Sequence, residues 1–73
     1  MRLMDTTTLG QRLKARRQRA GLSQRELGRR VGLTVSQISR LEGGHREPPI
    51  STLLRIASAC EADPGAIIRG LAA

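Results

Sequence analysis

Arginine is the most numerous residue type in this sequence that could do chemistry, and the arginines are unevenly placed along the chain. Of the 13 basic residues in the chain of 73, only Lys14 is not arginine. Nine of the 13 lie in residues 1–32, which hold two acidic residues, whereas residues 33–73 hold four basic and four acidic residues. Guanidinium groups bind phosphate and carboxylate oxygens through paired N–H groups. The first half of the chain is therefore predicted to attract a polyanion, such as nucleic acid, an anionic membrane or an acidic protein.

The other reactive side chains are too few for catalysis or metal binding. The chain has one cysteine, Cys60, and one histidine, His45, so it can form neither an internal disulfide nor an ordinary zinc site. Its scattered carboxylates form no constellation of acid, base and nucleophile. We expect no enzyme activity, no cofactor, no metal and no small-molecule ligand. The lone cysteine, with no signal peptide or membrane span in the sequence, predicts a cytoplasmic protein.

The composition limits the fold that must position these residues. A chain of 73 residues has room for one small domain. Apolar residues make up 38% of it, but Phe, Trp and Tyr are absent, so the core must be aliphatic. Most single-strand binders stack bases on aromatic side chains, which makes an RRM, OB or cold-shock fold improbable.

Capping residues divide the chain into helices. Three residue pairs that stand just before an apolar helical stripe match the capping box, in which a Ser or Thr and a Glu or Gln three residues later satisfy free N–H groups at a helix start. The pairs are Thr8 with Gln11, Ser23 with Glu26, and Thr34 with Gln37. Asp63 before Pro64 marks a further start. The sequence predicts no strand, a tail over residues 1–7, and a domain over 8–73 with helices at about 8–20, 23–31, 34–42, 50–60 and 64–71.

The segment from Gln24 to Gly43 places two short helices around a turn at Gly32, the outline of a helix-turn-helix. Its motifs are GLSQREL at 21–27, VGL at 31–33 and SQISRLE at 36–42, followed by Pro48, Leu53, Ile56 and Ala57. This pattern resembles the phage repressor and Cro type of DNA-binding domain, the XRE family, over residues 9 to about 71. The resemblance implies an all-α, five-helix, lambda-repressor-like domain that acts as a sequence-specific, double-stranded DNA-binding transcriptional regulator.

Four side chains share the outer face of the predicted helix 34–42, namely Val35, Ser36, Ser39 and Arg40. The resemblance implies that this helix enters the major groove and that these residues read bases. Val35 would touch a thymine methyl group, and Arg40 would bond the N7 and O6 atoms of a guanine. On its own, Val35 would be a tolerated exposed apolar residue, and Arg40 would be a phosphate clamp.

Five further residues are predicted to bind DNA phosphates: Gln24, Arg17, Gln37, His45 and Arg46. Gln24 opens the second helix, where free N–H groups and the positive helix end suit a phosphate. His45 and Arg46 lie in a loop of the kind that meets the backbone. Arg17 and Glu42 resemble the family pair that ties the first helix to the end of the third. As an ordinary exposed pair, they would contribute only about 0–1 kcal/mol to stability.

The neutral half of the chain predicts a homodimer, because two such halves can approach without charge repulsion. The last helix carries three large apolar residues that cannot all face one small core, since Ile68 lies about 100° around the helix from Ile67. We expect Ile67 in the core, and Ile68 and Leu71 in the dimer interface. A symmetric dimer implies a pseudo-palindromic operator.

Two alternatives belong to other functional classes. The same fold could serve as an antitoxin or adaptor that binds mainly another protein, through an exposed apolar patch on its last two helices. A membrane-surface amphipathic protein is disfavoured, because the basic helices carry a narrow apolar stripe and no Trp or Phe for the interface.

Overall fold

The computed structural model describes residues 5–69, and every regular element within them is a helix. The elements are α1 (Thr6–Arg19), α2 (Gln24–Val31), α3 (Val35–Glu42), α4 (Ile50–Ala59) and α5 (Pro64–Ile68). The predicted all-α, five-helix architecture is confirmed. None of the helices described is both long and apolar enough to cross a membrane. Among the same residues, His, Cys, Asp and Glu side chains do not gather into a group of three or more that could hold a metal ion.

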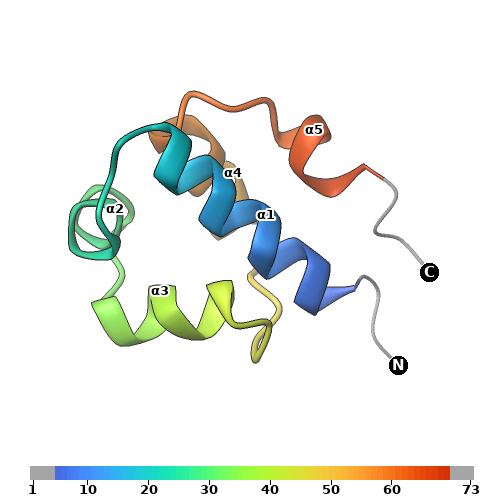
Figure 1. The fold of residues 1–73 in the computed structure, drawn as a ribbon, viewed down its shortest axis with the longest axis horizontal. Coiled ribbons are helices and arrows are strands. Elements are labelled where there is room, and N and C mark those ends of the chain that lie inside the picture. The colour runs from blue at the N-terminus through green and yellow to red at the C-terminus, as the bar shows by residue number, and fades with distance from the viewer. Residues whose placement is uncertain (1–4, 70–73) are drawn as a thin grey trace.

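Each of the five helices makes its main contacts with two others, and α1 is one example. It contacts α3 on one side and α5 on the other, while α2 packs against both α3 and α4. Figure 1 shows α1 crossing the middle of the molecule, with α3 along the lower edge and α5 at the upper right. This arrangement leaves one long side of α3 without a neighbouring helix.

The core is aliphatic, as the composition predicts. Its members are Leu9, Leu13, Leu22, Leu27, Val31, Ile38, Leu41, Leu53, Ile56, Ala57, Cys60 and Ile67. They come from all five helices, from the turn after α1 and from the C-cap of α4, so each amphipathic helix contributes one face. Cys60 belongs to this set, and burial raises the pKa of its thiol.

The start of α1 differs from the sequence prediction. The helix begins at Thr6, two residues before the predicted start, and its N-cap is Asp5 rather than Thr8. The Asp5 carboxylate accepts hydrogen bonds from the backbone N–H groups of Thr7 and Thr8, both at 3.1 Å, and from the Thr8 hydroxyl at 2.7 Å. A carboxylate that accepts three bonds outcompetes a threonine hydroxyl as a cap. Three residues that the prediction placed in the tail of 1–7 therefore belong to α1, Asp5 as its cap and Thr6 and Thr7 as its first two residues.

The other caps follow the pattern in the sequence. Both halves of the capping box are present at Ser23 for α2 and at Thr34 for α3, and Asp63 caps α5. The last helix ends at Ile68, with Arg69 as its C-cap, and residue 71, the predicted end, lies outside the described residues. At this end the guanidinium of Arg12 donates to the carbonyl oxygens of Ile67 and Arg69, at 3.1 and 2.6 Å. A side chain from α1 thus satisfies carbonyls at the end of α5.

Candidate nucleic-acid interface

The turn between α2 and α3 is unusually tight. Gly32 adopts the left-handed conformation with φ of 76°, and the N–H of Leu33 donates to the carbonyl of Gly28 at 2.8 Å. A Cβ atom on Gly28 would collide with the carbonyl oxygen of Leu33. Gly28 therefore allows the turn to fold back onto α2, and this contact sets where α3 begins.

The rear of α3 is buried and its outer face is open. Ile38 and Leu41 lie in the core. The four residues predicted to read bases, Val35, Ser36, Ser39 and Arg40, are all exposed, and Val35 leaves 43% of its surface to solvent. An exposed valine beside two hydroxyl groups and a guanidinium gives this face one apolar contact and several hydrogen-bonding groups. Such a set matches the groups that bases present in the major groove.

Arg17 and Glu42 form a buried ion pair between α1 and the end of α3. The Nε atom of Arg17 lies 2.6 Å from Oε2 of Glu42, and Nη2 lies 3.0 Å from Oε1, so the contact is bidentate. Each residue is only 8% exposed. Arg17 also donates from Nη1 to the carbonyl of Leu22 at 2.9 Å. The hydrogen bond to Glu42 raises the pKa of Arg17, against the opposing effect of burial.

Gln24 joins this pair, which the sequence analysis did not foresee. Its Nε2 atom donates to Oε1 of Glu42 at 3.1 Å, and the side chain is half-buried. The amide predicted to reach a phosphate is therefore directed towards Glu42, with its second N–H still open. Arg17 has the same constraint, since its guanidinium makes three hydrogen bonds and is largely buried. We assign to Arg17 first the role of orienting α3 through Glu42. Its contact with a DNA phosphate stays a prediction.

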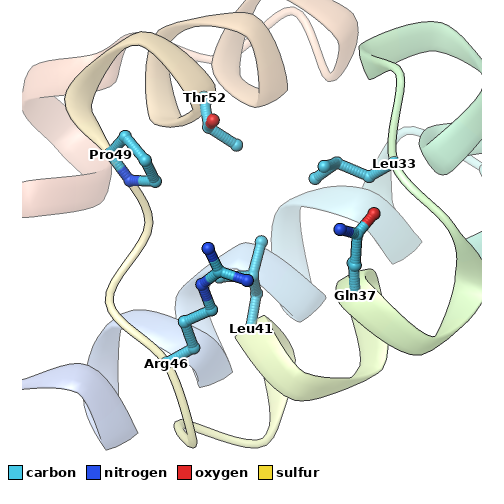
Figure 2. Close-up of a pocket in the computed structure, with 6 residues that line it drawn as sticks. All are labelled: Leu33, Gln37, Leu41, Arg46, Pro49 and Thr52. Atoms are coloured by element: carbon cyan, nitrogen blue, oxygen red, sulfur yellow. The ribbon is translucent and has the colours of Figure 1, made fainter.

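The remaining predicted phosphate contacts lie in the first turn of α3 and in the loop that follows this helix. His45 and Arg46 are exposed in the loop between α3 and α4. Gln37 is exposed too, but its Oε1 atom accepts the N–H of Thr34 at 2.9 Å, so only its NH₂ group can donate outward. Figure 2 shows Arg46 and Gln37 facing one opening, which Leu33, Leu41, Pro49 and Thr52 also line and whose volume is about 80 Å³.

Gly10 is a positioning residue that the sequence analysis missed. A Cβ atom there would lie 2.5 Å from the carbonyl oxygen of Leu41 and 2.6 Å from that of Glu42. The backbone of α1 therefore rests directly on the last turn of α3. A glycine inside a predicted helix was the available signal, since glycine weakens a helix unless a close approach requires it.

The predicted dimer residues fall in different surroundings. Ile67 is buried, as expected, whereas Ile68 is half-buried and packs against the core. Leu71 lies outside the described residues. Two apolar side chains that the sequence analysis did not select are more exposed. They are Ile50 and Leu54, one turn apart on α4, at 62% and 48%.

Comparisons with known proteins agree with this geometry. A family model described as a helix-turn-helix domain matches residues 8–67. The HTH-type transcriptional regulator y4dL of Sinorhizobium fredii is 43% identical over 56 residues, which are 77% of this chain and 29% of that protein. Repressor protein C2 of Salmonella phage P22 is 33% identical over 67 residues, 92% of this chain and 31% of that protein. The chain thus spans about a third of the length of the curated relatives it matches.

Solved structures extend the similarity to the whole fold. The restriction-modification controller protein C.AhdI of Aeromonas hydrophila superimposes with a TM-score of 0.83 at 33% identity, covering 88% of this chain and 93% of that one. The P22 c2 repressor in complex with a synthetic operator gives a TM-score of 0.77 at 32% identity, covering 85% and 94%. The curated relatives are named as regulators and repressors of transcription, not as enzymes.

Proposed function

The chain belongs to the phage-repressor type of helix-turn-helix domain, the XRE family, and on that basis we propose that it is a sequence-specific, double-stranded DNA-binding transcriptional regulator. The observation that carries the proposal is the division of α3 between a buried rear and an open polar face. The Arg17–Glu42 pair and the close approach of Gly10 hold that face in one orientation. The P22 c2 repressor, a relative with this fold, is solved on an operator.

In the proposed complex, α3 lies in the major groove, which is wide enough for one helix. The methyl groups of Val35 contact thymine methyl groups, and Arg40 bonds N7 and O6 of a guanine. Ser36 and Ser39 donate to or accept from base edges between them. These four residues determine which sequences are preferred.

Phosphate contacts position the domain on the duplex. We propose Arg46, His45 and the NH₂ group of Gln37 on one side of α3, and the second N–H of Gln24 on the other, with Arg17 behind it. Only Arg46 and Arg17 among these contacts are arginines, so the salt dependence also draws on the other basic residues of 1–32. If about five phosphates are neutralised in all, log K should fall against log salt with a slope of roughly −4 to −5. A slope near zero would contradict the electrostatic part of the proposal.

We propose further that two copies bind one pseudo-palindromic operator, with half-sites roughly 34–36 Å apart. One helix reads too few base pairs to select a single genomic site, since each good contact discriminates by about 1–3 kcal/mol. Ile68 and Leu71 stay the proposed interface, and the exposed Ile50 and Leu54 offer further apolar area. Sedimentation of the protein on its selected operator tests this architecture. A single copy bound there would refute it.

Selection of bound sequences from a random duplex pool tests the function itself. We expect an enriched motif that changes with Arg40→Ala or Val35→Ala, because these residues face the bases. Arg46→Ala should weaken all sequences alike and leave the motif unchanged. A pool that yields no motif would contradict sequence-specific binding.

An antitoxin or adaptor function stays the second candidate, because Ile50 and Leu54 are an apolar pair that nothing within residues 5–69 covers. Under this alternative, Leu54→Glu would abolish binding of a protein partner encoded nearby and leave DNA binding intact. Under the regulator function, the same substitution would weaken operator binding by the dimer.

A further inference from the structure

A second concave surface lies at the ends of three helices, and no residue of α3 lines it. The C-terminal ends of α1, α2 and α4 meet there around a pocket of about 410 Å³. Its walls include Arg16, Arg19, Leu22, Arg30, Cys60 and Glu61, and we call it the basic pocket. In Figure 1 the ends of α1 and α4 lie at the upper left, while α3 runs along the lower edge.

The three arginines of the basic pocket make no hydrogen bond and no ion pair among residues 5–69, in contrast to Arg12, Arg17 and Arg55. Arg30 also lines a neighbouring hollow with Glu26. Glu61 is the one acidic residue of the lining, so the pocket carries a net charge of about +2. Leu22 and Cys60 are buried beneath it and form an apolar floor. Charges beside an apolar wall act more strongly on a ligand than charges surrounded by water.

Helix capping does not account for this cluster. The N–H of Leu22 donates to the carbonyl of Arg17, and that of Ala62 donates to the carbonyl of Ala57, so the ends of α1 and α4 are satisfied by their own backbone. The helix dipoles favour positive charge at C-terminal ends, which explains why the arginines are tolerated there. The dipoles do not account for a pocket between the arginines, nor for what would fill it.

We propose that the basic pocket binds a small ligand carrying a phosphoryl group. A phosphate monoester carries about −1.5 to −2 at neutral pH, which matches the net charge of the pocket. Guanidinium groups approach phosphate oxygens with paired N–H donors, and here they come from two different helices. The volume lies in the range of roughly 300–1,000 Å³ that holds small molecules.

The proposed site is independent of the proposed DNA interface. None of the residues predicted to contact DNA lines the basic pocket. Positions 16, 19, 30 and 61 are brought together only by the packing of α1, α2 and α4, which is why the sequence analysis predicts no small-molecule ligand.

Titration of the whole chain with pyrophosphate tests this inference. At constant ionic strength in chloride, ¹H–¹⁵N NMR should show saturable shifts at the amides of Ala20, Arg30 and Glu61. Removing two guanidinium groups with Arg19→Gln and Arg30→Gln should weaken pyrophosphate binding at least about tenfold, since hydrogen bonds between charged groups are strong. Both side chains are exposed, so thermal unfolding in chloride should show that the double variant folds.

A matched control removes the same charge elsewhere. Lys14 and Arg25 are exposed and line none of the pockets described above, so the Lys14→Gln and Arg25→Gln double variant should bind pyrophosphate within about twofold of the original chain. The proposal would be overturned if pyrophosphate binding weakened equally in both double variants, or if the NMR shifts did not saturate and were spread over all arginines. Either result would mean that pyrophosphate is attracted only by the overall positive charge of the chain.

Two further outcomes bear on the ligand. Glu61→Gln removes the one carboxylate and should tighten pyrophosphate binding. Unchanged or weaker binding would contradict the charge match. Saturable shifts at Ser36 and Arg46 instead of Ala20 and Glu61 would place the phosphate on the DNA interface. Tighter binding of citrate than of pyrophosphate would overturn the phosphoryl assignment.

Discussion

Removal of the Glu42 carboxylate is expected to destabilise the whole domain. In Glu42→Ala, Arg17 loses two hydrogen bonds, of 2.6 and 3.0 Å, and Gln24 loses one of 3.1 Å. Arg17 is only 8% exposed, so its charge stays largely shielded from water if the fold is kept. An uncompensated buried charge costs about 3–5 kcal/mol. At roughly 0.05–0.15 kcal/mol per residue, a domain of this length has about 4–11 kcal/mol in total, so the loss is a large fraction.

Urea unfolding followed by circular dichroism measures this loss, since the chain has no tryptophan. Glu47→Ala, in the loop after α3, is the control and should cost well under 1 kcal/mol. The double variant Arg17→Met with Glu42→Leu should recover most of the stability, because apolar residues replace a buried pair without leaving a charge. A loss below about 1 kcal/mol in Glu42→Ala, or one that vanishes in 0.5 M salt, would show that the pair behaves as an exposed one and refute the reasoning.

Glu61 follows Cys60, the C-cap of α4, and has φ of 52°, a left-handed conformation that suits glycine. Glu61→Gly should therefore raise the unfolding free energy by about 0.5–1 kcal/mol in a urea titration. Unchanged stability would mean that no strain resides there. Gly10→Ala should lower it by about 1–3 kcal/mol despite the better helix propensity, because the new Cβ meets the carbonyl of Leu41 at 2.5 Å; a gain would contradict that contact. Hydrogen bonds from Ser23 lower the pKa of Glu26 in the folded chain, so this carboxylate stabilises the fold above its ordinary pKa and loses that effect as pH falls through the folded value. Glu26→Gln should therefore flatten stability against pH below about pH 4.5, and an unchanged profile would count against the cap.

The sequence predicts best what is decided within a few residues. The capping boxes at Ser23 and Thr34 are local, and the structure contains both. The predicted start of α1 is wrong because Asp5, like Thr8, precedes a possible helix. The choice between these two caps depends on which side-chain oxygen reaches more backbone N–H groups. Nothing local indicates that Arg12 reaches carbonyls 55 and 57 residues away.

The burial of charged side chains is the other property that the sequence pattern does not predict. The pairing of Arg17 with Glu42 follows from the resemblance, but the type and spacing of the two residues indicate an ordinary surface contact. Their burial depends on Leu22 and Gln24, which close over the pair from the turn after α1 and the start of α2. The sequence does not indicate that the arginines of the basic pocket lie together, because each has the pattern of a solvated residue on its own helix.

The double attachment of α3 has a kinetic consequence. The helix is held at its start by the turn at Gly28 and at its end by Gly10 and the Arg17–Glu42 pair. A recognition element fixed at both ends loses little freedom when it docks, and it also has little freedom to adapt to a wrong base. Mismatches opposite Val35 or Arg40 should therefore leave the association rate nearly unchanged and shorten the lifetime of the complex. This domain would therefore discriminate between DNA sites through the dissociation rate of the complex.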